Sequence, residues 1–122
     1  MAGAWFLGLS AALWFLYGLY CFFSPAALGA GAGVTFTSPT GLTELRAMYG
    51  GLQMALGFLA AIGLARPGLR QGAILALGVV TAGLGSTRLL GALIDGGWSA
   101  YTAMGLMFEW GSALWAASLL RR

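Results

Sequence analysis

Apolar residues dominate four long segments of the chain, and short, more polar stretches separate them. The segments lie at about 3–23, 44–65, 72–94 and 101–120. Each is close to the roughly 20 residues that an α-helix needs to cross about 30 Å of hydrocarbon. A segment inside a bilayer must satisfy its own backbone hydrogen bonds, so each is predicted to be helical. The pattern therefore predicts one all-α domain, residues 1–122, built as an integral membrane bundle of four transmembrane helices.

The arginines indicate how this bundle is oriented. The short connection between the second and third segments contains Arg66 and Arg70, and the chain ends with Arg121 and Arg122. With four spans these two regions lie on the same side of the membrane, and basic loops favour the cytoplasmic side. Both termini are therefore predicted to be cytoplasmic.

The longest connection, residues 24–43, is predicted to lie on the outer side. Its glycine-rich run, 29–33, lacks the strand and helix that flank a nucleotide-binding loop, so a flexible or partly re-entrant loop is predicted. Thr40 or Thr43 is expected to cap the second helix, and Glu44 suits the positive end of its dipole.

Composition strengthens the membrane assignment and excludes several kinds of function. Hydrophobic residues make up 60% of the chain and charged residues only 7%, whereas about 25% of the residues in soluble domains are charged. The six arginines are too scattered for a nucleic-acid patch, so no nucleic-acid partner is expected. With no histidine and one cysteine, Cys21, neither an intramolecular disulfide nor a common zinc or haem site is expected. No cofactor and no metal are predicted.

Small residues recur at helical spacing and predict close helix contacts, either within the bundle or in a homo-oligomer. One such row lies in the first segment and another in the third: Ala4, Gly8 and Ala12; Gly83, Thr87 and Gly91. Residues 41–66 also align with 97–122, which places Gln53 on Glu109. A duplication of two helical hairpins would produce this match, and so would chance in a chain so rich in Ala, Gly and Leu.

Polar residues alternate with small ones on a single face of three predicted helices. The three faces are Arg46, Tyr49, Gly50, Gln53 and Gly57; Thr81, Gly85, Arg88 and Ala92; and Gly105, Glu109, Ser112 and Ala116. Counting about 1.5 Å per residue from the outer ends places Gln53, Arg88 and Glu109 roughly 9–13 Å deep. A charge that faces lipid at the helix centre costs at least about 2.5–3.5 kcal/mol. These faces are therefore predicted to point inward, with an ion pair between Arg88 and Glu109.

The expected site joins six polar residues from the outer half of the bundle: Glu44, Arg46, Tyr49, Gln53, Arg88 and Glu109. Spare guanidinium donors are expected to meet Glu44, Asp95, water or a ligand. Three interpretations remain open. The polar residues form a network that only fixes helix register, a polar-floored pocket for an amphipathic or anionic molecule, or a proton or ion relay. No catalytic residue is predicted, because there is no close carboxylate pair and no base accompanies Cys21.

The segment 43–51, Thr-Glu-Leu-Arg-Ala-Met-Tyr-Gly-Gly, followed by Arg88 and Glu109, resembles an uncharacterised bacterial family of small four-helix membrane proteins. That family is similar to the DoxX-like superfamily. The resemblance covers nearly the whole chain and implies a four-helix bundle in the bacterial inner (cytoplasmic) membrane. Some DoxX-like proteins are associated with quinone-linked thiosulfate oxidation, but no cofactor motif here supports a transfer of that chemistry. Small multidrug transporters also have this length, yet they depend on a glutamate in the first helix, and the first segment here carries no charge.

The function expected from these residues is binding and not catalysis. The outer half of the bundle is expected to take a hydrophobic or amphipathic small molecule, lipid- or quinone-like, or another membrane subunit. The alternatives are a membrane subunit of a quinone-linked oxidoreductase and a structural polar network with no ligand. The lipid bilayer is the surrounding partner in each case.

Overall fold

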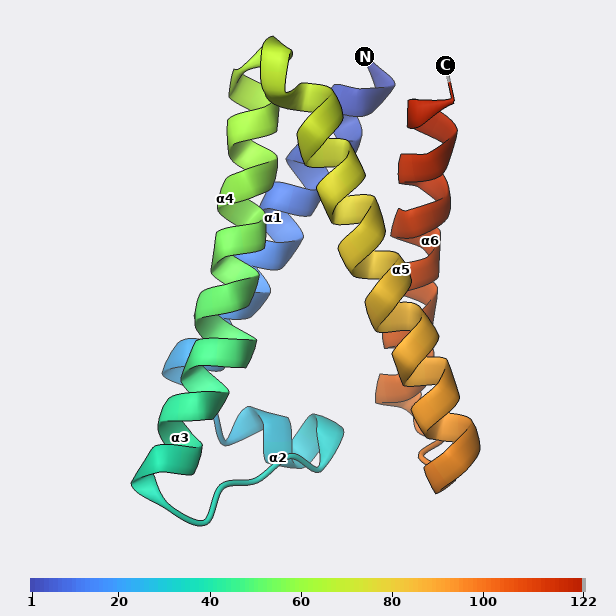
Figure 1. Cartoon of the computed structure of the whole chain (residues 1–122). Coiled ribbons are helices and arrows are strands. Elements are labelled where there is room, and N and C mark those ends of the chain that lie inside the picture. Colours follow the sequence, from blue (N-terminus) through green and yellow to red (C-terminus); the bar gives the residue numbers. More distant parts are fainter. Residues whose placement is uncertain (122) are drawn as a thin grey trace.

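The computed structural model describes residues 1–121, and every regular element within them is helical (Figure 1). Arg122 lies outside the described residues. The elements are α1 (Ala2–Phe23), α2 (Ala27–Ala32), α3 (Pro39–Leu45), the π-helix η1 (Arg46–Gly51), α4 (Leu52–Ala65), the 3-10 helix η2 (Pro67–Leu69), α5 (Arg70–Asp95) and α6 (Ala100–Leu120).

Three of these stretches are long and apolar enough to cross a membrane: Ala2–Phe23, Pro39–Ala65 and Pro67–Asp95. The fourth predicted span, 101–120, is present as α6, which has 21 residues. It is not among the stretches that composition alone marks as spans. The all-helical prediction is confirmed for the described residues, with three spans supported by composition.

The second long helix begins earlier than residue 44. Helices α3, η1 and α4 follow one another without a break, and Ser38 caps the first of them: its Oγ accepts a hydrogen bond from the Gly41 amide at 3.1 Å. Pro39 takes the first helical position, where its missing N–H costs nothing. The prediction of a Thr40 or Thr43 cap is wrong, since Thr43 Oγ1 instead donates to the Pro39 carbonyl at 3.1 Å.

The turn from Arg46 to Gly51 is a π-helix inside this long helix. A π-turn holds one more residue than an α-turn, and single π-turns occur often at functional sites. This turn carries Arg46 and Tyr49, two of the residues predicted for the site, and Tyr49 packs against the cluster that contains Cys21 of α1.

The connection expected to be a flexible or re-entrant loop contains the short helix α2. Leu28 anchors it, because its side chain is buried together with Cys21 and Leu45. Gly33 ends the helix in the left-handed conformation, with φ of 70°. In Figure 1, α2 lies across the end of the molecule farthest from the termini.

The long helices form two antiparallel pairs, α1 with α4 and α5 with α6 (Figure 1). Glycines bring α1 and α4 into close contact. A Cβ atom on Gly18 would lie 2.7 Å from the Gly50 carbonyl oxygen, and one on Gly57 would lie 2.7 Å from Phe15 Cβ. These approaches leave no room for a side chain, so α1 packs with its backbone close to that of η1 and α4.

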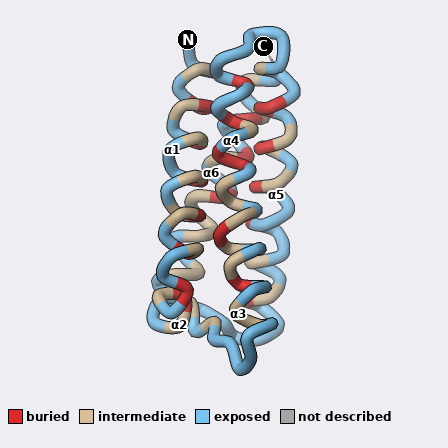
Figure 2. The backbone as a smooth tube through the Cα atoms, turned by 90° about the vertical axis from the view of Figure 1, so that its left-hand side faces the viewer, coloured by how far each residue is buried: buried red, intermediate tan, exposed pale blue. Residues whose placement is uncertain are grey.

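The two pairs meet near the termini and diverge toward the opposite end (Figure 1). Where they meet, Leu7, Ala60, Ile74 and Leu77 form the best-buried part of the core. Figure 2 shows that buried positions lie on the inward faces along the helices, with exposed positions outside. The two rows of small residues predicted to lie at helix contacts are only partly buried. Thr87, for example, is exposed.

Candidate functional site

A cavity of about 500 Å³ lies between the two helix pairs, in the half of the molecule where they diverge. Most of its walls are apolar, with polar side chains gathered on one part of the lining. The lining residues are Leu13, Trp14, Tyr17, Met48, Tyr49, Leu52, Gln53, Leu56, Leu84, Arg88, Tyr101, Met104, Gly105, Phe108 and Glu109. Each of the four long helices contributes, so the cavity exists only in the assembled bundle.

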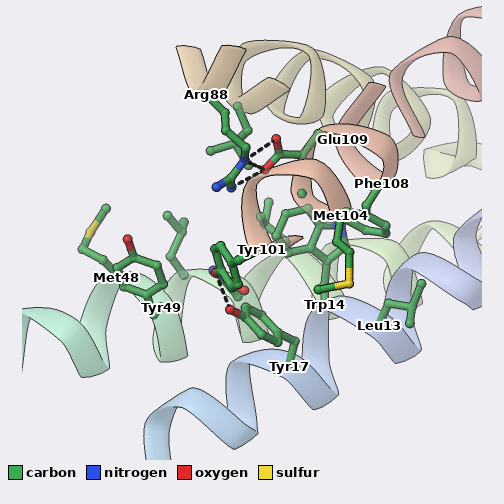
Figure 3. Close-up of a pocket in the computed structure, with 15 residues that line it drawn as sticks. Leu13, Trp14, Tyr17, Met48, Tyr49, Arg88, Tyr101, Met104, Phe108 and Glu109 are labelled. Carbon is green, nitrogen blue, oxygen red and sulfur yellow. Dashed lines mark hydrogen bonds and ion pairs between the residues drawn. The ribbon is translucent and has the colours of Figure 1, made fainter. Parts of the chain in front are cut away.

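The polar centre of the cavity is the ion pair between Arg88 on α5 and Glu109 on α6 (Figure 3). Arg88 Nη2 donates to Glu109 Oε1 at 2.6 Å, and Arg88 Nε donates to Oε2 at 2.8 Å. The two bonds give the bidentate geometry in which arginine–carboxylate pairs are strongest. The side chain of Glu109 is 4% exposed and that of Arg88 is 29% exposed. The predicted ion pair is therefore present, with its carboxylate buried and its guanidinium partly open to the cavity.

Two glycines make room for this pair between α5 and α6. A Cβ atom on Gly105 would lie 2.7 Å from Arg88 Nε, and one on Gly85 would lie 3.3 Å from Glu109 Cβ. The guanidinium thus passes over α6 at a position without a side chain. Both glycines belong to the small-residue faces that the sequence predicts to point inward.

Two tyrosines connect the helix pairs beside the ion pair. The hydroxyls of Tyr17 on α1 and Tyr101 on α6 are hydrogen-bonded at 2.7 Å. The Arg88 guanidinium carbon lies 5.8 Å from the centre of the Tyr101 ring, within the range of a cation–π contact. In Figure 3 the guanidinium end of Arg88 lies between Glu109 and Tyr101. The ring therefore stabilises the guanidinium in the position from which it binds Glu109.

Polar atoms at the cavity remain without partners among residues 1–121. The side-chain oxygen of Gln53, Oε1, is buried and accepts no hydrogen bond. Arg88 uses Nε and Nη2 for Glu109, and its Nη1 makes no hydrogen bond to a described residue. A buried polar atom without a partner costs about 1–3 kcal/mol. The cavity thus presents one unsatisfied acceptor and at least one free donor.

The structure brings four of the six predicted site residues to the cavity: Tyr49, Gln53, Arg88 and Glu109. The other two lie outside its lining. Glu44 is exposed on α3, and Arg46 stacks over the ring of Phe22, with its guanidinium carbon 5.5 Å from the ring centre. Glu44 and Arg46 therefore do not line the cavity. Asp95, at the exposed end of α5, makes no ion pair with Arg88.

Several lining residues are not among the six that the sequence predicts for the site. They include Tyr17, Tyr101, Met48 and Met104. A signal for α1 was present, since Trp14, Tyr17, Gly18 and Cys21 repeat at helical spacing, and all four are at least partly buried. Because α1 carries no charged residue, nothing in its sequence distinguishes this face from an ordinary helix-packing face.

The sequence of residues 3–120 matches a family described as "Domain of unknown function (DUF4345)". The match covers nearly the whole chain. The chain belongs to the DUF4345 family. No curated protein and no solved structure matches it significantly. The resemblance to an uncharacterised family is thus confirmed, while nothing links this DUF4345 chain to the DoxX-like superfamily.

Proposed function

We propose that this DUF4345 protein is a four-span membrane protein that binds an amphipathic small molecule in the cavity between its helix pairs. The observation that carries the proposal is a cavity of about 500 Å³ with apolar walls and unpaired polar atoms on Gln53 and Arg88. Small-molecule sites usually combine these features: mostly apolar walls and a few polar groups that orient the ligand. No catalytic role is proposed, since the lining supplies no nucleophile beside a base.

The positions of the two chain termini support α6 as the fourth membrane span. Both termini lie at the same end of the molecule (Figure 1), which requires an even number of crossings. Helix α6 packs antiparallel along α5 and returns the chain from the far end. Arg66 and Arg70 lie at the end with the termini, so the positive-inside rule places that end in the cytoplasm. The cavity then lies in the outer half of a cytoplasmic membrane, which in bacteria is the inner membrane.

The free polar atoms indicate the chemistry of the ligand's head. Arg88 Nη1 requires an acceptor such as a carbonyl, carboxylate or phosphate oxygen. Gln53 Oε1 requires a donor such as a hydroxyl. A lipid-like head with both groups satisfies the two atoms at once, and the apolar walls suit its hydrocarbon part. A bare metal cation is disfavoured, because Glu109 already accepts from Arg88 and the described residues include no group of metal-binding side chains.

The experiment compares the small molecules that remain bound after gentle extraction from membranes. Protein would be purified in a mild detergent, and its organic extract would be analysed by mass spectrometry. The informative variant is Gln53→Leu, and Gln71→Leu is its matched control, because Gln71 lies at the exposed start of α5. Losing one hydrogen bond worth about 0.5–1.5 kcal/mol weakens binding roughly 2- to 10-fold. We expect one enriched compound in wild type and Gln71→Leu and much less of it in Gln53→Leu.

A double variant, Arg88→Leu with Glu109→Leu, separates ligand binding from a purely structural polar network. It removes both charges together, so no unpaired charge remains in the interior. If the pair binds a ligand head, the double variant folds and loses the enriched compound. If it retains the compound at the wild-type level, or if wild type itself carries only bulk lipids, the proposal fails.

A further inference from the structure

A second cavity of about 330 Å³ lies along the seam between α1 and α6, on the side of the first cavity nearer the termini. It is lined by Phe6, Leu9, Ser10, Leu13, Phe108, Gly111, Ser112 and Trp115. The lining carries no charged side chain, so this space suits an uncharged and mostly apolar group.

The second cavity adjoins the first. Leu13 and Phe108 belong to the linings of both. The Phe108 ring also meets Trp14 edge to face, with the ring centres 5.5 Å apart, and Trp14 lines the first cavity. The two spaces therefore share a boundary at the level of Phe108, one helical turn or less from Glu109.

The far end of the second cavity is closed by another aromatic pair between the same two helices. Phe6 and Trp115 meet edge to face with ring centres 5.3 Å apart. From Gly105 in the first cavity to Trp115 is ten residues of α6, or about 15 Å along its axis. The two adjoining cavities together extend over about this length, from the ion pair to the Phe6–Trp115 pair, and are called the α1–α6 groove below.

The groove is open on its outward side. Its floor is low because Ser10 and Ser112 have small side chains and Gly111 has none, and a Cβ atom on Gly111 would meet nothing within 4 Å. Leu9 and Leu13, along its edge, are 49% and 52% exposed. In a membrane this side faces lipid, so a hydrocarbon chain enters the groove without crossing a polar layer.

We infer that the α1–α6 groove holds the hydrocarbon tail of a single-chain amphiphile whose polar head lies at Arg88 and Gln53. The inference rests on the proposed function and adds the ligand class and its direction. One tail fits, because the groove has one open side and is blocked at one end by the Phe6–Trp115 pair. The head lies in the outer half of the bundle and the tail points toward the end with the termini.

Tryptophan quenching by brominated amphiphiles tests the position of the tail. Trp14 lines the first cavity and Trp115 the second, while Trp5 is 69% exposed and reports quenching from bulk lipid. Three proteins would each keep one of these tryptophans, with the other four replaced by phenylalanine, and would be placed in nanodiscs. The probes are 2-bromohexadecanoic acid, brominated beside the head, and 16-bromohexadecanoic acid, brominated at the end of the tail.

We expect saturable quenching of Trp14 by the 2-bromo probe and of Trp115 by the 16-bromo probe. Trp5 should show only non-saturable quenching by either probe. Gly111→Leu should remove the saturable quenching of Trp115 and leave that of Trp14, because its side chain fills the groove. Gly83→Leu is the matched control: Gly83 also has open space around it, on α5 and outside both cavities, so this variant should behave as wild type.

The failures of the two proposals are distinguishable. Saturable quenching of Trp14 without that of Trp115, or quenching of Trp115 that survives Gly111→Leu, overturns the tail position and leaves the cavity as a binding site. Saturable quenching of neither residue overturns the amphiphile itself. If Gly111→Leu and Gly83→Leu change the quenching of Trp115 equally, the tail position is also overturned. An equal change would reflect a general effect of the added side chain.

Discussion

Removing the charges of the Arg88–Glu109 pair one at a time and together should give strongly non-additive stabilities. Arg88→Leu leaves the Glu109 carboxylate, which is 4% exposed, without its partner. Breaking a buried pair in this way costs about 3–5 kcal/mol. Glu109→Leu leaves the Arg88 guanidinium, which is 29% exposed and adjoins the cavity. Its cost should be nearer the value of charged hydrogen bonds, about 1.5–3 kcal/mol.

The double variant should be close to wild type. Two leucines of similar size replace the pair and leave no charge in the interior, a change that is often neutral or stabilising. The coupling energy, which is the difference between the double variant and the sum of the singles, should then be about 3 kcal/mol or more.

The measurement is equilibrium unfolding in mixed micelles, with the sodium dodecyl sulfate fraction raised stepwise and helix content followed by far-UV circular dichroism. The unfolding free energies of the four proteins complete the double-mutant cycle. Additive effects would refute the reasoning, because they would mean that the two side chains do not interact. A larger loss for Glu109→Leu than for Arg88→Leu would refute the assignment of the carboxylate as the more deeply buried partner.

Two further predictions concern packing and topology. Gly57→Ala should lower the unfolding free energy by about 1–3 kcal/mol, because the added methyl group overpacks against α1. Gly83→Ala is the control and should not lower it, because Gly83 has open space around it. Equal effects of the two variants would contradict the close α1–α4 contact. For topology, a membrane-impermeant maleimide should label Thr35→Cys in intact cells and Gly68→Cys only after lysis. The native Cys21 is 1% exposed and should stay unlabelled in both. The reverse labelling pattern would contradict the cytoplasmic placement of the termini.

The fold followed from the sequence because hydrophobic length and helical spacing are strong signals in a membrane chain. Three of the four predicted segments agree with their helices to within two residues at each end. The exception is the start of the second helix. There the apolar run begins well after the helix itself, and the Ser38–Pro39 pair that starts it was taken as part of a loop.

The site was predictable where a residue is costly in hydrocarbon. Arg88 and Glu109 stood out for that reason, and they form an ion pair with each other. Tyr17 and Tyr101 did not stand out, because a tyrosine near a helix end suits the membrane interface as well as it suits a cavity. Helical spacing alone does not reveal that the Arg46 guanidinium stacks on Phe22 and lies outside the cavity lining.

The π-turn at Arg46–Gly51 has a consequence for how this chain tolerates insertions and deletions. One residue of an α-helix corresponds to about 100° of rotation. Because a π-turn takes up its extra residue locally, deleting one residue there would give a regular α-helix and leave α3 facing nearly as it does now. Leu45 would keep its buried contact with Leu28. Deleting one residue from the regular part of α4 would instead rotate the chain before it, Gln53 included, by about that angle relative to the rest of the helix. The π-turn is thus the place in this long helix where one residue can be lost without turning α3 away from α2.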